Sequence, residues 1–258
     1  ARCFAEAVQQ LLAANQLPAS RITALGSHGQ TIWHQPPRPG TTYPFTLQLG
    51  DPNTIAALTG ITTVADFRRR DMAAGGQGAP IVPALHRALF SLPGTNRMVL
   101  NLGGIANITV LPADNHLPYG FDTGPASVLL DGWIDRHQGL PFDDGGAWAA
   151  TGTLQPLLLQ QLMLEPYLQL PAPKSTGREL FNLPWLDRQL TATGQDFSTA
   201  DVQATLLEFT ALSVAQAVTS CGDCGDLIVC GGGARNLVLL ARIAALLPHF
   251  KISTSTEH

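Results

Sequence analysis

The sequence carries little charge of either sign. Only 13% of its 258 residues are charged, with 15 Lys and Arg against 19 Asp and Glu. A chain with so few cations has no broad positive field to attract nucleic acid or anionic lipid. This shortage argues against a role on nucleic acid or at a membrane surface.

Long hydrophobic runs and cysteines are also scarce. The longest apolar runs, such as residues 227–230 and 237–247, are well short of the ~20 residues that cross a bilayer. The four cysteines are too few and too unevenly spaced for a disulfide scaffold. Cys221 and Cys224 have CxxC spacing, but no second pair or nearby histidine completes a metal site, and none is expected. We therefore expect a soluble protein of the reducing cytoplasm.

Hydrophobic residues make up 45% of the chain, enough for a substantial core. Apolar residues at helical spacing predict helices over 3–15, 54–58, 83–90, 128–136, 154–164, 201–218 and 236–247. Short β-prone runs predict strands at 22–25, 45–49, 61–65, 98–102, 105–111 and 227–230. This alternation indicates an α/β fold. We place a boundary after residue 93, which gives an N-terminal domain of residues 1–93 and a C-terminal domain of residues 94–258.

Two glycine turns are candidate phosphate sites. NLGGIAN at residues 101–107 joins two strands, and its glycines let backbone N–H groups approach an anion. GGGARN at residues 231–236 lies between a buried strand and a helix, where exposed amides favour polar or negative ligands. Each turn has a structural alternative: the first glycines would only supply positive φ, and the second would only allow close helix packing.

Between these turns, GFDTGPAS at residues 120–127 places a single carboxylate beside a hydroxyl residue and a turn. Asp122 is the best general-base candidate, because a carboxylate can accept a proton from a positioned water or hydroxyl. The alternative is an ordinary Asp that caps a turn.

Three further polar segments could bind an anionic sugar. Lys174, Ser175 and Thr176 lie in the loop PKSTGRE, with Arg178 close behind. Arg68 to Arg70 follow a strand and precede a glycine-rich loop, and SHGQT at residues 27–31 follows another strand. The alternatives are solvated surface charges and a structural His28.

Seven segments occur in an order that resembles the anhydro-N-acetylmuramic acid kinases: SHGQTIWH, DFRRRDMAAGGQGAPIVP, NLGGIANITV, GFDTGPASVLLDGW, PAPKSTGRELFN, DVQATLLEFTA and IVCGGGARN. Long ordered segments are more specific than any single short motif. The resemblance implies a two-domain actin-like ATPase fold of the ribonuclease H-like type, incomplete in this chain. It also implies ATP and Mg²⁺ as cofactors, a homodimer, and an enzyme of peptidoglycan recycling.

By resemblance, Asp122 matches the catalytic aspartate that activates water to open the 1,6-anhydro ring, while the freed O6 accepts the γ-phosphoryl group. The expected product is N-acetylmuramic acid 6-phosphate. The residues expected to bind phosphate and ATP are Asn101, Gly103, Gly104, Asn107, Gly231, Gly232, Gly233, Arg235 and Asn236. Those expected to bind the sugar are His28, Gln30, Asp66, Arg68, Thr123, Gly124, Lys174, Ser175 and Thr176.

The sequence departs from the family pattern in two respects. Ala126 and Ser127 stand where the family usually has Gly and Asn, which makes local substrate contact an open question. The family's opening phosphate segment and its closing helices have no counterpart, so we expect a chain cut at both ends and inactive alone. One alternative is a non-catalytic sugar- or nucleotide-binding module, and another is an acid-sugar kinase, against which PKSTGRE argues.

Overall fold

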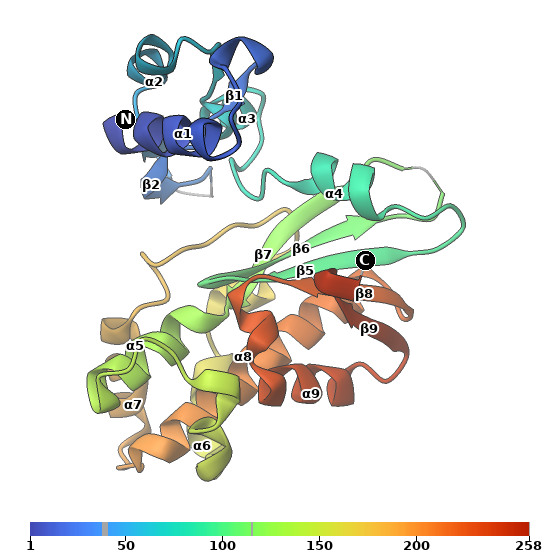
Figure 1. The fold of residues 1–258 in the computed structure, drawn as a ribbon. Coiled ribbons are helices and arrows are strands. Elements are labelled where there is room, and N and C mark those ends of the chain that lie inside the picture. The colour runs from blue at the N-terminus through green and yellow to red at the C-terminus, as the bar shows by residue number, and fades with distance from the viewer. Residues whose placement is uncertain (38–40, 115, 258) are drawn as a thin grey trace. The chain divides into compact units, whose positions relative to one another are not determined.

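The computed structural model describes residues 1–37, 41–114 and 116–257. The chain divides into two compact units, Ala1–Ile81 and Val82–His258. Both mix helices and strands, so the α/β class is confirmed (Figure 1). The division falls earlier than the boundary expected after residue 93. The reason is that helix α4 (Pro83–Phe90) packs on strand β6 of the second unit.

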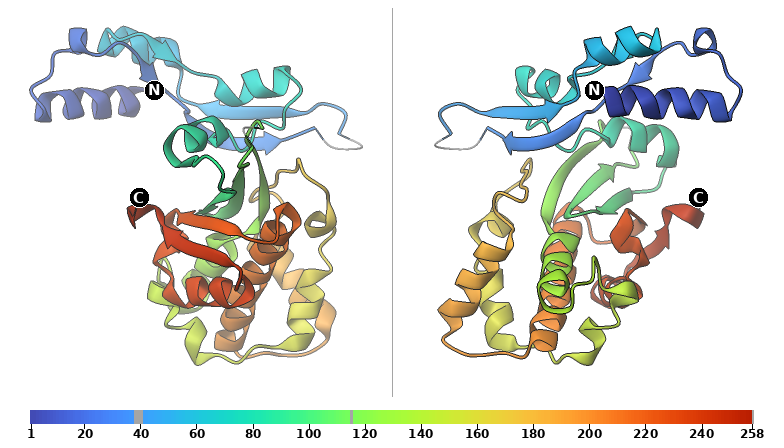
Figure 2. Two further views of the ribbon diagram at one scale, coloured as in Figure 1. Left: turned by 90° about the vertical axis from the view of Figure 1, so that its right-hand side faces the viewer. Right: turned by 60° about the vertical axis from the view of Figure 1, so that its left-hand side comes forward.

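The first unit consists of short elements. They are α1 (Arg2–Ala14), β1 (Leu25–Gly26), β2 (Gln30–Gln35), β3 (Phe45–Leu49), α2 (Pro52–Thr59), β4 (Thr63–Val64) and α3 (Phe67–Ala73). Strands β1 and β4 pair in parallel, whereas β2 and β3 form an antiparallel hairpin (Figure 2). The strand β2 and the helix α3 were not among the elements predicted from the sequence.

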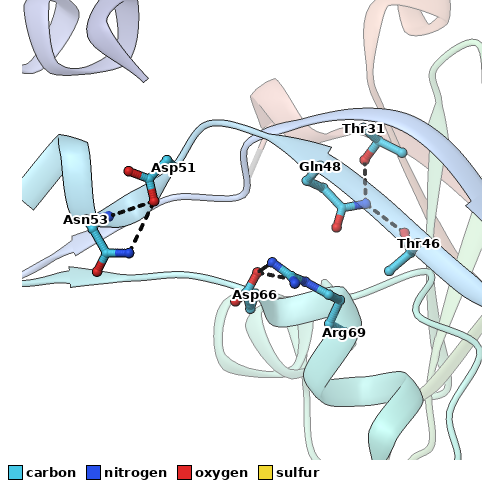
Figure 3. A network of polar contacts seen from close by, with 7 residues as sticks. All are labelled: Thr31, Thr46, Gln48, Asp51, Asn53, Asp66 and Arg69. Carbon is cyan, nitrogen blue, oxygen red and sulfur yellow. Dashed lines mark hydrogen bonds and ion pairs between the residues drawn. The ribbon is translucent and has the colours of Figure 1, made fainter.

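Side-chain hydrogen bonds fix the local geometry of this unit (Figure 3). Asp51 caps α2 by accepting from the amides of Asn53 and Thr54, and its pKa is lowered, chiefly by the hydroxyl hydrogen bond from Thr54. On the β2–β3 hairpin, the Gln48 amide nitrogen donates to the hydroxyls of Thr31 and Thr46, at 3.2 and 2.7 Å. The Asp51 bonds satisfy amides at the start of α2 that have no partner within the helix, and the Gln48 bonds link side chains across the hairpin.

The second unit is built on a five-stranded sheet in the order β7-β6-β5-β8-β9. The strands are β5 (Arg97–Leu102), β6 (Ile105–Leu111), β7 (Tyr119–Pro125), β8 (Gly225–Cys230) and β9 (Phe250–Thr254). Strand β6 is antiparallel to both of its neighbours, and β5, β8 and β9 run parallel. The predicted hairpin of residues 98–111 is therefore confirmed, with its turn at Gly103 and Gly104.

Helices cover one face of this sheet (Figures 1 and 2). They are α5 (Ser127–Gln138), α6 (Pro156–Met163), α7 (Leu183–Thr193), α8 (Thr199–Cys221) and α9 (Leu237–Leu246). Alternate residues of each strand point into the main core, such as Leu100 and Leu102 on β5. Val99 and Ile228 belong to a smaller cluster with Phe90 on the opposite face. This alternation follows from the two-residue period of a strand.

Helix α8 is the central element of the main core. It begins at the cap that Ser198 provides to the Asp201 amide, and most of its residues from Val202 to Val218 are buried. It is also the one helix of the described residues with the length and apolarity to cross a membrane. Its burial against the sheet and α6 accounts for that apolar composition, since a helix packed on several sides is hydrophobic all round.

Candidate functional site

A cavity of about 370 Å³ in the second unit brings the two predicted glycine turns together. Gly103 and Gly104 line it from the β5–β6 turn, and Gly232, Gly233, Arg235 and Asn236 line it from the end of β8. Its other walls come from the start of α5 and from the loop at residues 142–145. Such a volume is typical of a small-molecule site.

The glycines of these turns are required for different reasons. Gly231 has φ +87°, and a Cβ there would lie 2.5 Å from Asn101 Oδ1; a Cβ on Gly233 would lie 2.7 Å from Leu102 Cβ. These two glycines let the turn fit against the end of β5, a contact different from the helix packing considered from the sequence. Gly232 meets nothing within 4 Å.

Gly103 and Gly104 fit neither structural explanation. Neither has a left-handed φ, and a Cβ on either would meet its nearest neighbours at 3.5 and 3.6 Å, which is ordinary contact. Their carbonyl groups accept hydrogen bonds from the amides of Ser127 and Val128 at the start of α5, at 3.0 and 3.1 Å. Neither backbone conformation nor packing within the unit therefore requires glycine at these positions. This favours the interpretation that the absence of a side chain lets a ligand approach the backbone closely.

Two carboxylates that line the cavity, Asp143 and Asp131, differ in their hydrogen bonds and charged neighbours. Both oxygens of the buried Asp143 accept backbone hydrogen bonds, from the amides of Trp148 at 2.8 Å and Ala149 at 2.9 Å. Burial raises the pKa of Asp131, as does the charge of Asp143, whereas the Ser127 hydroxyl and the Arg178 charge lower it. Asp143 is thus structural, and Asp131 is a carboxylate that can face a ligand.

Asp122 lies on β7, outside the lining of this cavity. Its side chain shares a face of the sheet with those of Asn107 and Asn101, because Asp122 pairs with Asn107 and Asn107 pairs with Asn101 across neighbouring strands. The three predicted polar residues therefore form a row, on the face opposite the main core. Asn101 also accepts a weak contact from the Cys230 thiol at 3.9 Å.

The loop at residues 166–176 holds Asp122 at three atoms. The Asp122 amide donates to the Lys174 carbonyl at 3.0 Å, its carbonyl accepts from the Tyr167 hydroxyl at 2.8 Å, and its Oδ2 accepts from the Thr176 amide at 2.9 Å. Asp122 is only 5% exposed. The Thr176 hydroxyl beside it is buried and has no hydrogen-bond partner among the described residues. A buried hydroxyl of this kind is a place where a ligand or water can bind.

Lys174 does not present its charge to a ligand in this arrangement. The ammonium group donates to the carbonyls of Tyr167 and Leu168, at 3.2 and 3.0 Å, and lies 4.8 Å from the centre of the Tyr167 ring. Burial lowers the pKa of Lys174. Lys174 therefore supports the loop that holds Asp122, and its contact with the sugar stays a prediction.

Other predicted sugar-binding residues of this unit have structural surroundings. Thr123 is buried, points to the core side of β7, and donates a long 3.4 Å bond to the Ala106 carbonyl. A Cβ on Gly124 would lie 3.2 Å from Ser213 Oγ, so this glycine allows α8 to pack closely. Ser175 is 1% exposed, and Ala126, which replaces the family's usual glycine, is buried in the main core.

The first unit contains a separate polar cluster around Arg68. Arg68 Nε donates to His28 Nε2 at 2.8 Å, and its Nη1 donates to the Gly78 carbonyl at 2.6 Å. With Nε2 as acceptor, the proton of His28 is on Nδ1, which faces the Gly29 carbonyl at 2.8 Å. Asp66 pairs with Arg69, and Gln30 donates to the Thr31 carbonyl at 3.2 Å. His28 and Arg68 are thus brought together, while Asp66 and Gln30 make other contacts.

Sequence reasoning missed Tyr167, Ser127 and Asp131 as parts of the site. The spacing of Ser127 and Asp131, four residues apart on α5, is a signal that both face the same way. Tyr167 gives no such signal, because only the folded loop carries it to Asp122. No group of three or more His, Cys, Asp and Glu that could hold a metal is found in residues 1–37, 41–114 and 116–257.

Comparisons with known proteins identify the family. The family model described as anhydro-N-acetylmuramic acid kinase matches residues 1–258. A protein of that name from Saccharophagus degradans is 53% identical over 99% of this chain and 69% of its own length. Another from Photobacterium profundum is 53% identical over 98% of this chain and 68% of its own length.

Among solved structures, the activator of the 2-hydroxyisocaproyl-CoA dehydratase from Clostridium difficile with bound ADPNP matches with a TM-score of 0.44 and 14% identity, over 78% of this chain and 72% of its own. The family match extends over the cavity, the row of polar residues and the loop that holds Asp122. The chain belongs to the anhydro-N-acetylmuramic acid kinase family.

Proposed function

We propose that this protein uses ATP to open the 1,6-anhydro ring of anhydro-N-acetylmuramic acid and to phosphorylate O6, which gives N-acetylmuramic acid 6-phosphate. The observation that carries the proposal is the cavity lined by both glycine turns, with Gly103 and Gly104 free of any internal demand for glycine. Backbone amides at such turns bind phosphate well. The sheet order β7-β6-β5-β8-β9 is consistent with the actin-like ATPase fold.

Asp122 is the general base of this proposal. One proton of a water molecule passes to the carboxylate, and the water oxygen bonds to C1 of the sugar as the C1–O6 bond breaks. The freed O6 bonds to the γ-phosphorus, the bond to the β-phosphate oxygen breaks, and ADP leaves. Asp122 then releases its proton to solvent. The Thr176 amide keeps the carboxylate oriented, and the unpartnered Thr176 hydroxyl is a sugar contact.

Each glycine turn is proposed to bind a different part of the nucleotide. Gly103, Gly104 and the amide side chains of Asn101 and Asn107 serve the phosphates, and residues 231–236 serve the adenosine. Mg²⁺ would neutralise phosphate charge; its ordinary oxygen ligands are phosphates, water and one or two carboxylates. Asp131 suits that role because it lines the cavity, whereas the oxygens of Asp143 are occupied.

In the first unit, His28 and Arg68 are proposed to contact the sugar as one hydrogen-bonded pair. We infer a homodimer in the cytoplasm, where ATP is available and where the free thiols of Cys3, Cys221, Cys224 and Cys230 stay reduced. We keep residues 1–93 and 94–258 as the proposed domains, with the contact boundary after Ile81 as the structural alternative.

The test is an assay of the full-length gene product with ATP and the anhydro sugar, beside its Asp122→Asn variant. We expect turnover to fall about 10²–10⁴-fold in the variant, which is the usual contribution of general-base catalysis. The Asp114→Asn variant is a matched control, because Asp114 is an exposed aspartate that pairs with the exposed His116. Undiminished turnover in Asp122→Asn would remove Asp122 as the base.

A further inference from the structure

Arg178 lies against the turn of the β5–β6 hairpin. The nearest atom to a Cβ built on Gly104 would be Arg178 Nη2 at 3.6 Å, followed by Arg178 Nε and Val128 Cβ, both at 3.9 Å. The side chain is exposed, and no ion pair to it is found among the described residues. Its guanidinium is therefore close to the candidate phosphate turn and is available to a ligand there.

Charge balance at the cavity calls for such a cation. The lining contains the carboxyl groups of Asp131, Asp143 and Asp144, but only one cationic side chain, that of Arg235, which follows the turn at the end of β8. A nucleotide triphosphate adds several negative charges to this set. Arg178 is outside the lining but lies against Gly104, which is part of it, and its charge lowers the pKa of Asp131 against the larger effect of burial.

The backbone around Arg178 is anchored on both sides. The Thr176 amide is bonded to the Asp122 carboxylate, and the Phe181 side chain is 0% exposed and packs edge-on against Tyr167 and Trp185. The Arg178 carbonyl accepts from the Asn182 side chain at 2.9 Å. A short anchored segment thus carries the contact to the base at Thr176 and the guanidinium at Arg178, two residues further on.

We propose that Arg178 binds the terminal phosphoryl group of the nucleotide beside Gly103 and Gly104 and stabilises it during transfer. This inference rests on the proposed kinase function. In the transfer, the bond from the γ-phosphorus to the β-phosphate oxygen breaks with its electron pair on ADP, and the bond to the sugar O6 forms. Arg178 contributes two parallel N–H donors to the phosphoryl oxygens as their charge redistributes. The segment that carries Arg178 also carries the Thr176 amide that is bonded to Asp122, so one segment positions both the base and the cation.

The experiment compares wild type with Arg178→Gln and Arg178→Lys, and uses Arg188→Ala as a control, because Arg188 is another exposed arginine of the same unit, on α7. We expect Arg178→Gln to lower kcat by about 10²–10³-fold with little change in the KM for the sugar. Arg178→Lys should recover only part of the lost kcat, because the lysine ammonium is a compact charge and lacks the two parallel N–H donors of the planar guanidinium. Arg188→Ala should match wild type.

Binding of ADP and of a non-hydrolysable ATP analogue supplies a second readout on the same proteins. We expect Arg178→Gln to weaken the ATP analogue about tenfold or more and to leave ADP unchanged. Unchanged kcat, or equal losses for ADP and the ATP analogue, would overturn the role of Arg178. If wild type binds nucleotide but never phosphorylates the sugar, the proposed function fails. The affinity for the ATP analogue relative to that for ADP would still decide whether Arg178 contacts the terminal phosphate.

Discussion

The backbone amide of Thr176 donates a 2.9 Å hydrogen bond to the Oδ2 atom of Asp122, across a sequence separation of 54 residues. The carbonyl of Lys174 accepts from the Asp122 amide, so the loop runs beside β7 at the edge of the sheet. The orientation of the proposed base therefore depends on a loop that is remote in sequence. This relationship explains why Lys174, Thr176 and Asp122 belong to one site although only Asp122 is proposed to move a proton.

Thr176→Val should leave stability nearly unchanged or slightly higher, because its hydroxyl is buried without a partner in the described structure. The same change at Thr205 is the control, since the Thr205 hydroxyl donates to the Asp201 carbonyl at 2.7 Å and accepts from the Gln155 amide at 3.0 Å. We expect Thr205→Val to cost about 1–3 kcal/mol. Urea unfolding of both variants measures this difference.

The same Thr176→Val variant should raise the KM for the sugar about tenfold, which is the loss of one hydrogen bond from the complex. The KM for ATP should stay as in wild type. An unchanged KM for the sugar would mean that the buried hydroxyl binds water and makes no contact with the sugar.

Gly104→Ala and Gly231→Ala should separate ligand contact from folding. A Cβ at Gly104 meets only ordinary contacts, so we expect an unchanged Tm and about tenfold weaker nucleotide binding. Gly231→Ala must adopt φ +87° and place a Cβ 2.5 Å from Asn101 Oδ1, so we expect a clear fall in Tm. Thermal unfolding and nucleotide titration give both quantities; full nucleotide affinity in folded Gly104→Ala would contradict the phosphate contact.

His86 should make stability depend on acid pH. Burial lowers the pKa of His86 below its usual 6.5, and its Nδ1 is 2.8 Å from the Thr109 hydroxyl. The unfolded state then binds the proton more readily, so the free energy of unfolding falls as pH drops below 6.5 and stops falling below the folded pKa. His86→Gln lacks this titration. Urea unfolding at pH 7.5 and pH 5 should show a smaller acid loss in the variant than in wild type, and equal losses would be incompatible with a lowered pKa.

Tyr167→Phe should affect catalysis through the position of Asp122. The change keeps the ring packing against Phe181 but removes the hydroxyl that donates to the Asp122 carbonyl at 2.8 Å. We expect a stability loss of about 1 kcal/mol and a fall in kcat without a change in the KM for ATP. Tyr43→Phe is the control, since Tyr43 is 81% exposed and should tolerate the change. A loss of stability with normal kcat would make Tyr167 purely structural.

Most helices and strands of the second unit could be predicted from the sequence, because the signals for them are local. The hairpin at residues 97–111, the helix after Ser198 and the strand, glycine turn and helix near residue 231 follow from period, caps and glycines. In the first unit, α3 was missed because Arg68, Arg69 and Arg70 read as a charged loop, although three arginines in succession are compatible with a helix. The short β2 has no clear alternation, and its pairing with β3 is what makes it a strand.

The site was predictable where one short segment carries its chemistry, and less so where contacts are long-range. The two glycine turns line one cavity, and the family resemblance implies that both bind ATP. The direction of the Lys174 ammonium, toward the carbonyls of Tyr167 and Leu168, was beyond sequence reasoning. A lysine among hydroxyl residues indicates ligand binding from sequence, while its burial depends on the fold of the loop.

The most direct test of the proposed reaction is the mass balance of the sugar product. The full-length gene product is incubated with ATP, Mg²⁺ and anhydro-N-acetylmuramic acid, and the sugar and ADP are followed by mass spectrometry. Coupled ring opening and transfer predicts a sugar that gains one water and one phosphoryl group together, with one ADP formed for each. A sugar that gains only one of the two groups, or ADP formed without phosphorylated sugar, would contradict the mechanism built on Asp122 and the two glycine turns.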